Sequence, residues 1–344
     1  MIIGVCTFYN YSISPVDKNS NEEIEVVIPN GASTTQIGAI LKEKDLIHSK
    51  NIFRVYCYIY KDKSSGMKAG TYTLKKSMKL EEIINVLREG NNYNPDEIKI
   101  TFNEGINMRK IASIIGKNTN NTEEDVYNLL KDNQYIDSLI KDYWFITDEI
   151  KNTNIYYSLE GYLNCDTYKF KNKDVTVKEI FKKLLDERKK VLDKYKNEIE
   201  GSNYTVHQLL TLASMVELEG VIDSDRAGIA SVFYNRLNSN WSLGSDVTSY
   251  YANKVEMNER DLKVAEYNLE NPYNTRTSSM AGKLPVGPIS NPSEASIKAV
   301  LYPQKSNYYF FVSDKNRKVY FSKTQSEQNA TIAQLKKEGK WFEW

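Results

Sequence analysis

The sequence predicts an α+β protein, with a small N-terminal module followed by a larger mixed α/β domain. The chain has 344 residues, and a length of about 150 residues per domain favours two domains. Short alternating apolar runs are typical of strands, and apolar residues at helical spacing are typical of helices. Near the C-terminus, residues 308–322 predict two strands around a polar turn at 314–317, and residues 326–337 predict a final helix. The larger domain therefore should end in a β-hairpin and a helix.

An internal similarity supports the small module. Residues 24–41 (IEVVIPNGASTTQIGAIL) resemble residues 98–115 (IKITFNEGINMRKIASII). Each segment predicts a strand, a glycine turn and an amphipathic helix with a capping side chain at its start. The glycine and the capping residue are Gly31 and Ser33 in the first copy, and Gly105 and Asn107 in the second. Two modules built alike would explain the similarity, and so would a coincidence between two common supersecondary units.

The remaining elements follow from the same periodicities. Residues 71–74 predict a strand, and Ser77 is predicted to cap a helix that stops at Gly90. The first 90 residues therefore form a small α+β module. Further helices are expected from Thr122, at 175–195 and at 206–219, and loops rich in Asn, Thr, Gly and Pro begin near residue 155.

The first nine residues, MIIGVCTFY, are apolar. A spanning helix needs about 20 such residues, so this stretch is either the outer end of a membrane anchor or a short buried strand. The polar segment that follows, with Pro15, reads as a linker.

Composition excludes several classes of function. Lys and Arg number 46 against 45 Asp and Glu, whereas a nucleic-acid-binding protein usually carries a basic stripe. The three cysteines are far apart in sequence and odd in number, so no disulfide framework is implied. The two histidines, His48 and His207, form no metal-binding motif. We therefore expect no metal, no cofactor and no nucleic-acid partner.

The helix VHQLLTLASMVELEG carries the chemically interesting residues. It is apolar around most of its circumference, so it should be buried. Glu217 and Glu219 near its end are two residues apart and point to different sides, so they cannot act as a close pair. Val216, Met215 and Leu212 share the face of Glu219. Glu217 shares its face with smaller and more polar residues.

Glu219 also lies in the last helical turn, just before Gly220. Apolar burial and the negative end of the helix dipole both disfavour a carboxylate, so both should raise the pKa of Glu219. An acid that is protonated near neutral pH can protonate a glycosidic oxygen. The alternative from spacing alone is a helix-terminal Glu that bonds to a loop or faces solvent.

Polar residues in the next segments are candidates for a substrate groove. Arg226 could pair with a carboxylate, and Asp246 is either a substrate ligand or a simple helix N-cap. Fixed loops rich in Pro and Gly can line a groove, although ordinary turns have the same composition. The candidate substrate-binding residues are Asn235, Arg236, Thr248, Tyr273, Asn274, Thr275, Pro285 and Gly287.

An ordinary glycosidase needs a second carboxylate. Glu160, Asp166 and Asp246 are candidates, and Glu217 is a further supporting candidate, but sequence distance alone places none of them beside Glu219. A serine hydrolase using His207 is disfavoured because no nucleophile-elbow motif lies nearby.

Several blocks, in order, resemble the MltG-type (YceG-like) endolytic murein transglycosylases. The blocks are AGTYTL, LEGYLNCDTY, LASMVELEG, SVFYNRLNSNWSLGSDVTSYYA, NPYNTRT and LPVGPISNPSEASIKAVLYP, and the resemblance runs from about residue 22 to the end. The chain departs from the family pattern at Val247 and Val286, where Pro is usual, and at Asn164, Cys165 and Gly220. None of these departures removes a carboxylate.

The resemblance implies a domain plan and a setting. Residues 1–21 would be the remnant of a truncated single-pass membrane anchor and a linker, and residues 22–92 a LysM-like module. Residues 93–150 would be a second strand–helix module or connector, and residues 151–344 the catalytic domain. The enzyme would act outside the cytoplasm on peptidoglycan glycan strands, and penicillin-binding proteins of wall synthesis are possible partners.

The resemblance also implies a mechanism that needs one carboxyl group. The second Glu of the family's E-x-E motif corresponds to Glu219, which would protonate the leaving oxygen. It would then accept a proton from the C6 hydroxyl of the muramic acid, which closes a 1,6-anhydro ring without water. Cleavage inside nascent strands rather than at their ends is likewise implied only by the family. A hydrolytic muramidase and a non-catalytic peptidoglycan-binding scaffold are the alternatives.

Overall fold

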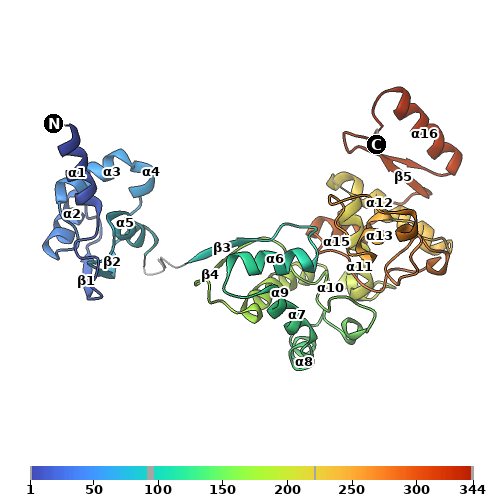
Figure 1. The fold of residues 1–344 in the computed structure, drawn as a ribbon, viewed down its shortest axis with the longest axis horizontal. Coiled ribbons are helices and arrows are strands. Elements are labelled where there is room, and N and C mark those ends of the chain that lie inside the picture. The colour runs from blue at the N-terminus through green and yellow to red at the C-terminus, as the bar shows by residue number, and fades with distance from the viewer. Residues whose placement is uncertain (1, 91–96, 221, 342–344) are drawn as a thin grey trace. The chain divides into compact units, whose positions relative to one another are not determined.

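A computed structural model describes residues 2–90, 97–220 and 222–341 (Figure 1). The chain divides into two compact units, Met1–Glu97 and Ile98–Trp344, each with its own hydrophobic core. Both units mix helices with small two-stranded sheets, so the predicted α+β class is confirmed. The boundary predicted between residues 92 and 93 lies outside the described residues.

The first unit is built around one antiparallel strand pair. Its elements are α1 (Ile2–Ile13), β1 (Glu23–Ile28), α2 (Thr34–Glu43), α3 (Lys50–Ile59), α4 (Lys61–Ser64), β2 (Gly70–Lys75) and α5 (Leu80–Glu89). β1 pairs with β2 so that Val26 lies opposite Tyr72, and both side chains are buried. Leu41, Phe53 and Ile83 from the helices complete the core.

The structure corrects two predictions for this unit, the linker and the cap at Ser77. Of the two alternatives for the apolar start, the strand is excluded, because Ile2–Ile13 form the helix α1. α1 continues to Ile13, which packs with Tyr9 against the core of the unit, so the predicted linker is partly helical and packed. Helix α5 is capped at Lys79, whose N–H donates to the Glu82 carboxylate, and not at Ser77.

The second unit is mainly helical and contains two small two-stranded sheets. Its elements are β3 (Ile98–Thr101), α6 (Met108–Asn118), α7 (Glu123–Lys131), α8 (Asn133–Asp142), η1 (Asp148–Lys151), β4 (Thr167–Phe170), α9 (Val177–Asp193), α10 (Lys196–Glu200), α11 (Val206–Glu219), α12 (Asp223–Asn238), α13 (Asp246–Ala252), α14 (Val264–Tyr267), η2 (Ser278–Met280), α15 (Glu294–Leu301), β5 (Phe310–Ser313), β6 (Val319–Ser322) and α16 (Gln325–Lys337). β3 pairs antiparallel with β4, and β5 with β6. The predicted hairpin and final helix are confirmed.

Residues 98–150, which we predicted as a second module or connector, lie in the same compact unit as the residues that follow. The reason is the β3–β4 pairing, which joins Ile100 to Tyr168 across the segment between them. The core residues of α6 and α7 also belong to the same cluster as those of α11.

The two similar segments fold alike locally. Gly31 and Gly105 have φ angles of 75° and 76°, in the left-handed region that favours glycine. Ser33 accepts a hydrogen bond from the N–H of Gln36, and Asn107 accepts one from the N–H of Lys110. The predicted turns and caps are confirmed.

Helix α11 lies at the centre of the second unit, packed against α12, α13 and α15 (Figure 1). Its residues from Leu209 to Val216 are all buried. Thr205 caps its start and accepts from the N–H of Gln208, while Gly220 ends it. This packing fixes the helix end that carries Glu217 and Glu219.

Candidate active site

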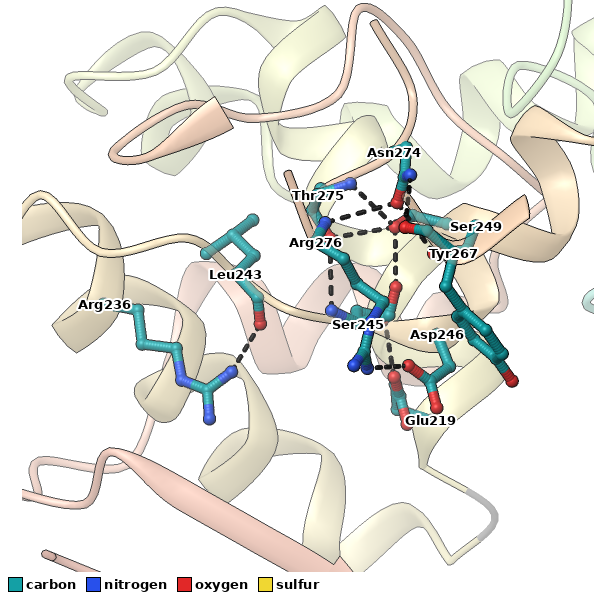
Figure 2. A network of polar contacts seen from close by, with 11 residues as sticks. Glu219, Arg236, Leu243, Ser245, Asp246, Ser249, Tyr267, Asn274, Thr275 and Arg276 are labelled. Atoms are coloured by element: carbon teal, nitrogen blue, oxygen red, sulfur yellow. Dashed lines mark hydrogen bonds and ion pairs between the residues drawn. The ribbon is translucent and has the colours of Figure 1, made fainter. Parts of the chain in front are cut away.

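Glu219 ends α11 beside the start of α13. The hydroxyl of Ser245 donates a hydrogen bond of 2.6 Å to Glu219 Oε1. The Glu219 side chain is half-buried. Figure 2 shows Ser245 directed at this carboxyl group, with Asp246 and Arg276 close by. Glu219 is therefore held in place by a neighbouring helix and keeps part of its surface open.

The surroundings of Glu219 disfavour its ionised form. Burial raises its pKa to about 7, and the nearby Asp246 carboxylate acts in the same direction. The Ser245 hydrogen bond and the Arg236 guanidinium oppose this shift because both stabilise the anion. The pKa rises in the direction that the helix position and its apolar face predicted.

A buried polar network holds Ser245 in position (Figure 2). The N–H of Ser245 donates to Thr275 Oγ1 at 3.1 Å, and the N–H of Gly244 donates to the Thr275 carbonyl. Thr248 donates to the Ser245 carbonyl at 2.6 Å. Gly244 has a φ of 60°, which lets the chain turn sharply before α13.

Four predicted substrate-binding residues are enclosed by the protein, and two of them, Thr248 and Thr275, belong to this network. Thr248, Tyr273, Asn274 and Thr275 are each 0% exposed. Asn274 accepts from Ser249 and donates to the carbonyls of Tyr267 and Leu269. Side chains this deeply enclosed cannot contact a glycan, so we correct their role from binding substrate to positioning the loop.

Asn235 and Arg236 also face the protein. Asn235 donates to the carbonyls of Ser306 and Tyr308. Arg236 donates to the carbonyls of Tyr309 and Leu243. Both side chains thus tie α12 to the segment that leads into β5, and Arg236 adds a positive charge near Glu219.

Pro285 and Gly287 lie buried against α11. The carbonyl of Val286 is bonded to His207 Nε2 at 2.9 Å, and the other ring nitrogen of His207 is bonded to the Tyr162 hydroxyl. An added side-chain carbon at Gly287 would meet the His207 ring at 3.3 Å. The loop therefore packs against the core, and His207 is a structural residue.

Glu217 forms a buried ion pair. Its carboxylate lies 2.8 Å from Arg226 Nη1, and the two side chains are 7% and 8% exposed. It also accepts from the N–H and hydroxyl of Ser293, the residue that caps α15. Glu217 thus joins α11, α12 and α15, which is a structural role.

The other candidate carboxylates differ in access. Glu160 is 1% exposed and accepts from the N–H of Met108, the hydroxyl of Tyr251 and the amide of Asn291. Burial raises the pKa of Glu160 to about 7. The Asp166 side chain is exposed and accepts a hydrogen bond from the N–H of Thr167.

Among the candidate carboxylates of the described residues, Asp246 is the one that raises the pKa of Glu219. It is exposed and pairs with Arg276. Asp246 is the first residue of α13, and Ser245 occupies the cap position. The simple N-cap interpretation of Asp246 is therefore wrong.

A small cavity of about 200 Å³ opens beside the site. It is lined by Leu218 and Val247, the chain neighbours of Glu219 and Asp246, and by Tyr250 and the start of α6.

Within residues 2–90, 97–220 and 222–341, no group of three or more His, Cys, Asp or Glu side chains is placed to hold a metal ion.

Comparisons with known proteins show the family to which this chain belongs. The model of the YceG-like family matches residues 26–334. The chain belongs to the YceG-like family. A YceG-like protein of Listeria monocytogenes, solved at 2.6 Å, matches with a TM-score of 0.63 and 35% identity, over 90% of this chain and 99% of that one.

Relatives of this YceG-like chain carry a functional name. The endolytic murein transglycosylase of Bacillus subtilis (strain 168) is 36% identical over 335 residues, which is 96% of this chain and 89% of that protein. The endolytic murein transglycosylase of Streptococcus pneumoniae serotype 2 is 32% identical over 338 residues, 94% of this chain and 60% of that protein.

Ser245 is the functional residue that sequence reasoning missed in this YceG-like chain. Its partner Glu219 lies 26 residues away, and no periodicity connects a loop to a helix end at that distance. The Gly244–Ser245–Asp246 run indicates the start of a helix, but it does not identify Glu219 as the partner of the Ser245 hydroxyl.

We predict that Ser245→Ala moves the alkaline limb of kcat/KM for glycan cleavage upward by about one pH unit. Loss of the donated hydrogen bond destabilises the Glu219 anion, so the acid stays protonated to higher pH. The measurement is a pH–rate profile from pH 5 to 9. Ser242→Ala is the matched control because Ser242 donates to the Thr277 carbonyl instead. A limb that stays in place or moves to lower pH would refute this role.

Proposed function

We propose that this chain is an endolytic peptidoglycan lytic transglycosylase in which Glu219 is the acid and then the base. The observation that carries the proposal is the half-buried Glu219 carboxyl group, whose pKa of about 7 suits proton transfer in both directions. The names of the relatives from B. subtilis and S. pneumoniae, and their similarity over at least 94% of this chain, support the substrate class.

The reaction follows from one carboxyl group and the substrate. Protonated Glu219 donates its proton to the glycosidic oxygen as the bond from C1 of the muramic acid to that oxygen breaks. The C6 oxygen of the same sugar then bonds to C1, and its proton passes to the Glu219 carboxylate. An intramolecular nucleophile has a high effective concentration. The products are a free hydroxyl end and a 1,6-anhydro end, and water is not consumed.

The network around Glu219 supports the double role. Ser245 stabilises the anion after the first proton transfer, and Arg236 adds to this stabilisation. Burial keeps the anion basic enough for the second transfer. The cavity beside Leu218 and Val247 is of a size to accept one substituent of a sugar ring.

Product analysis tests this function. We expect mass spectrometry of digested, uncrosslinked glycan strands to show 1,6-anhydro-muramic acid ends, with early products of intermediate length if cleavage is endolytic. The hydrolytic alternative would use Asp246, because that carboxylate alone among the candidates acts on Glu219 and is exposed. Reducing ends alone would establish a muramidase, and binding without either product would establish a scaffold.

The proposal also covers the role of the first unit, the location of the protein and its partners. The antiparallel pairing of β1 and β2, with α2, α3 and the four-residue α4 between them in the chain, supports a LysM-like, glycan-binding role for the first unit. Among the described residues, no helix combines the length and apolar character that a bilayer span requires. We propose attachment to the cell membrane at the N-terminal side, an extracytoplasmic catalytic unit, action on nascent strands, and penicillin-binding proteins as partners. Cell fractionation and co-purification from membranes test these points.

A further inference from the structure

A second cavity of about 550 Å³ lies in the same unit, away from Glu219. It is formed by α7 and α8, by residues 150–158 and by Lys254, which follows α13. We call it the lysine–tyrosine cavity after Lys131, Lys151, Lys254, Tyr127, Tyr156 and Tyr157, which line it. Its volume is within the range that proteins use for small ligands.

The charges favour an anionic ligand. Lys151 is paired with Asp137 and Asp148 at 2.7 Å each. Lys131 and Lys254, by contrast, have no ion pair with a carboxylate among the described residues, and Glu124 is the one acidic residue of the lining. Two cations are therefore available at the edge of the cavity.

The tyrosines supply fixed walls. The Tyr127 and Tyr157 rings are stacked with centroids 5.7 Å apart. The Tyr156 hydroxyl donates to the carbonyl of Ala252 and accepts from Asn271, and Lys254 Nζ lies 4.5 Å from the centre of its ring. Flat rings with hydroxyl groups suit a peptide that combines short apolar side chains with polar groups.

Lys254 occupies an unusual backbone position. It has a φ of 56° and directly follows Asn253, the C-cap of α13. Glycine is the usual residue at such a position. The chain thus presents a lysine where the backbone favours a residue without a side chain.

Helix α13 connects this cavity to the active site. Asp246 at its start acts on Glu219, and Lys254 follows its end. A helix rises about 1.5 Å per residue, so the seven residues of α13 span about 10 Å. A peptide of four or five residues reaches about 13–18 Å when extended. A substituent on the sugar at Glu219 can therefore reach the cavity.

We propose that the lysine–tyrosine cavity binds the carboxylate-bearing stem peptide of the glycan strand that is cut at Glu219. This inference rests on the proposed function, because stem peptides are carried on the lactyl group of muramic acid. Lys131 and Lys254 pair with carboxylates of the peptide, and the tyrosine rings contact its backbone and methyl groups.

The test compares one strand preparation in two forms, with its stem peptides and after an amidase has removed them. The kcat/KM for 1,6-anhydro end formation is measured for the full chain and for Lys131→Gln, Lys254→Gln and the double variant. We expect the double variant to lose about tenfold on peptide-bearing strands, as two ion pairs would give, and less than twofold on stripped strands. Lys254→Arg should retain the wild-type value, and added salt should reduce the preference for peptide.

Lys117→Gln is the matched control, since Lys117 is exposed on α6 and lies outside the cavity. Thermal unfolding of each variant shows whether it folds, and Lys131 and Lys254 lie on different elements, so one variant remains informative if the other unfolds. Equal losses on both strand forms, or no loss on peptide-bearing strands, would overturn the inference. Failure of the proposed function is a separate result, seen as wild-type chain that yields no anhydro ends from either form.

Discussion

Glu219→Gln is expected to lower kcat for glycan cleavage by at least about a thousandfold, because a positioned acid or base contributes about 10²–10⁴-fold and Glu219 is used in both roles. Gln is close to Glu in size and can still accept the Ser245 hydrogen bond through its amide oxygen. Its amide cannot deliver a proton to the leaving oxygen. Release of anhydro-ended products by a fixed amount of enzyme measures the effect.

The same variant should fold normally. Glu219 has a folded-state pKa of about 7, above the ordinary value of 4.5, so its ionisation lowers stability as pH rises from about 4.5 to 7. Gln has no such ionisation, and the variant should therefore unfold no more easily than wild type at pH 8.

Asp246→Asn is the comparison for catalysis. We expect it to retain cleavage within about tenfold, since it removes no proton that the one-carboxyl mechanism needs. A loss as large as that of Glu219→Gln would contradict that mechanism and favour two carboxylates.

Glu217→Ala is expected to lower the free energy of unfolding by about 3 kcal/mol, the lower end of the range for breaking a buried ion pair. Arg226 is 8% exposed and would lose its buried partner, although Asp223 stays 3.0 Å from its Nε. The N–H and hydroxyl of Ser293 would also lose their acceptor. Urea unfolding at pH 7 measures the change.

Two further variants serve as controls for the loss of stability in Glu217→Ala. Glu187→Ala removes a pair with Lys190 that is exposed on α9, and it should cost less than about 1 kcal/mol. Glu217→Ala combined with Arg226→Met removes both buried charges and should recover part of the loss. A cost below about 1 kcal/mol for Glu217→Ala alone would show that the pair does not stabilise the junction of α11, α12 and α15.

Glu219→Gln and Glu217→Ala test two residues that are only two positions apart in the sequence but have different roles. Spacing on a helix is enough to predict that Glu217 and Glu219 face different ways, and the structure confirms this. The apolar face of Glu219 also predicts the direction of its pKa shift, because burial is the largest cause of that shift. What spacing cannot supply is the identity of each partner, because Arg226, Ser245 and Ser293 come from other elements.

Local signals predicted the fold well where they act over three or four residues. Ser33 and Asn107 cap the helices that follow them, the helix expected from Thr122 is present, and the turns at Gly31 and Gly105 have the expected conformation. The failures at the predicted groove come from long-range packing. Tyr273, Asn274 and Thr275 lie in an Asn- and Pro-rich segment, which is also the composition of an exposed groove, and only tertiary burial distinguishes the two.

The two similar segments share one turn conformation, but the surroundings of the two turns differ. At Gly31 an added side-chain carbon would meet nothing within 4 Å, whereas at Gly105 it would meet Glu217 Cγ at 3.4 Å. The first turn is free to vary in everything except its backbone conformation. The second is constrained from outside as well, by the helix that ends in Glu219. Mutational tolerance should therefore differ between the two copies, and drift in the first copy would erase their resemblance sooner than drift in the second.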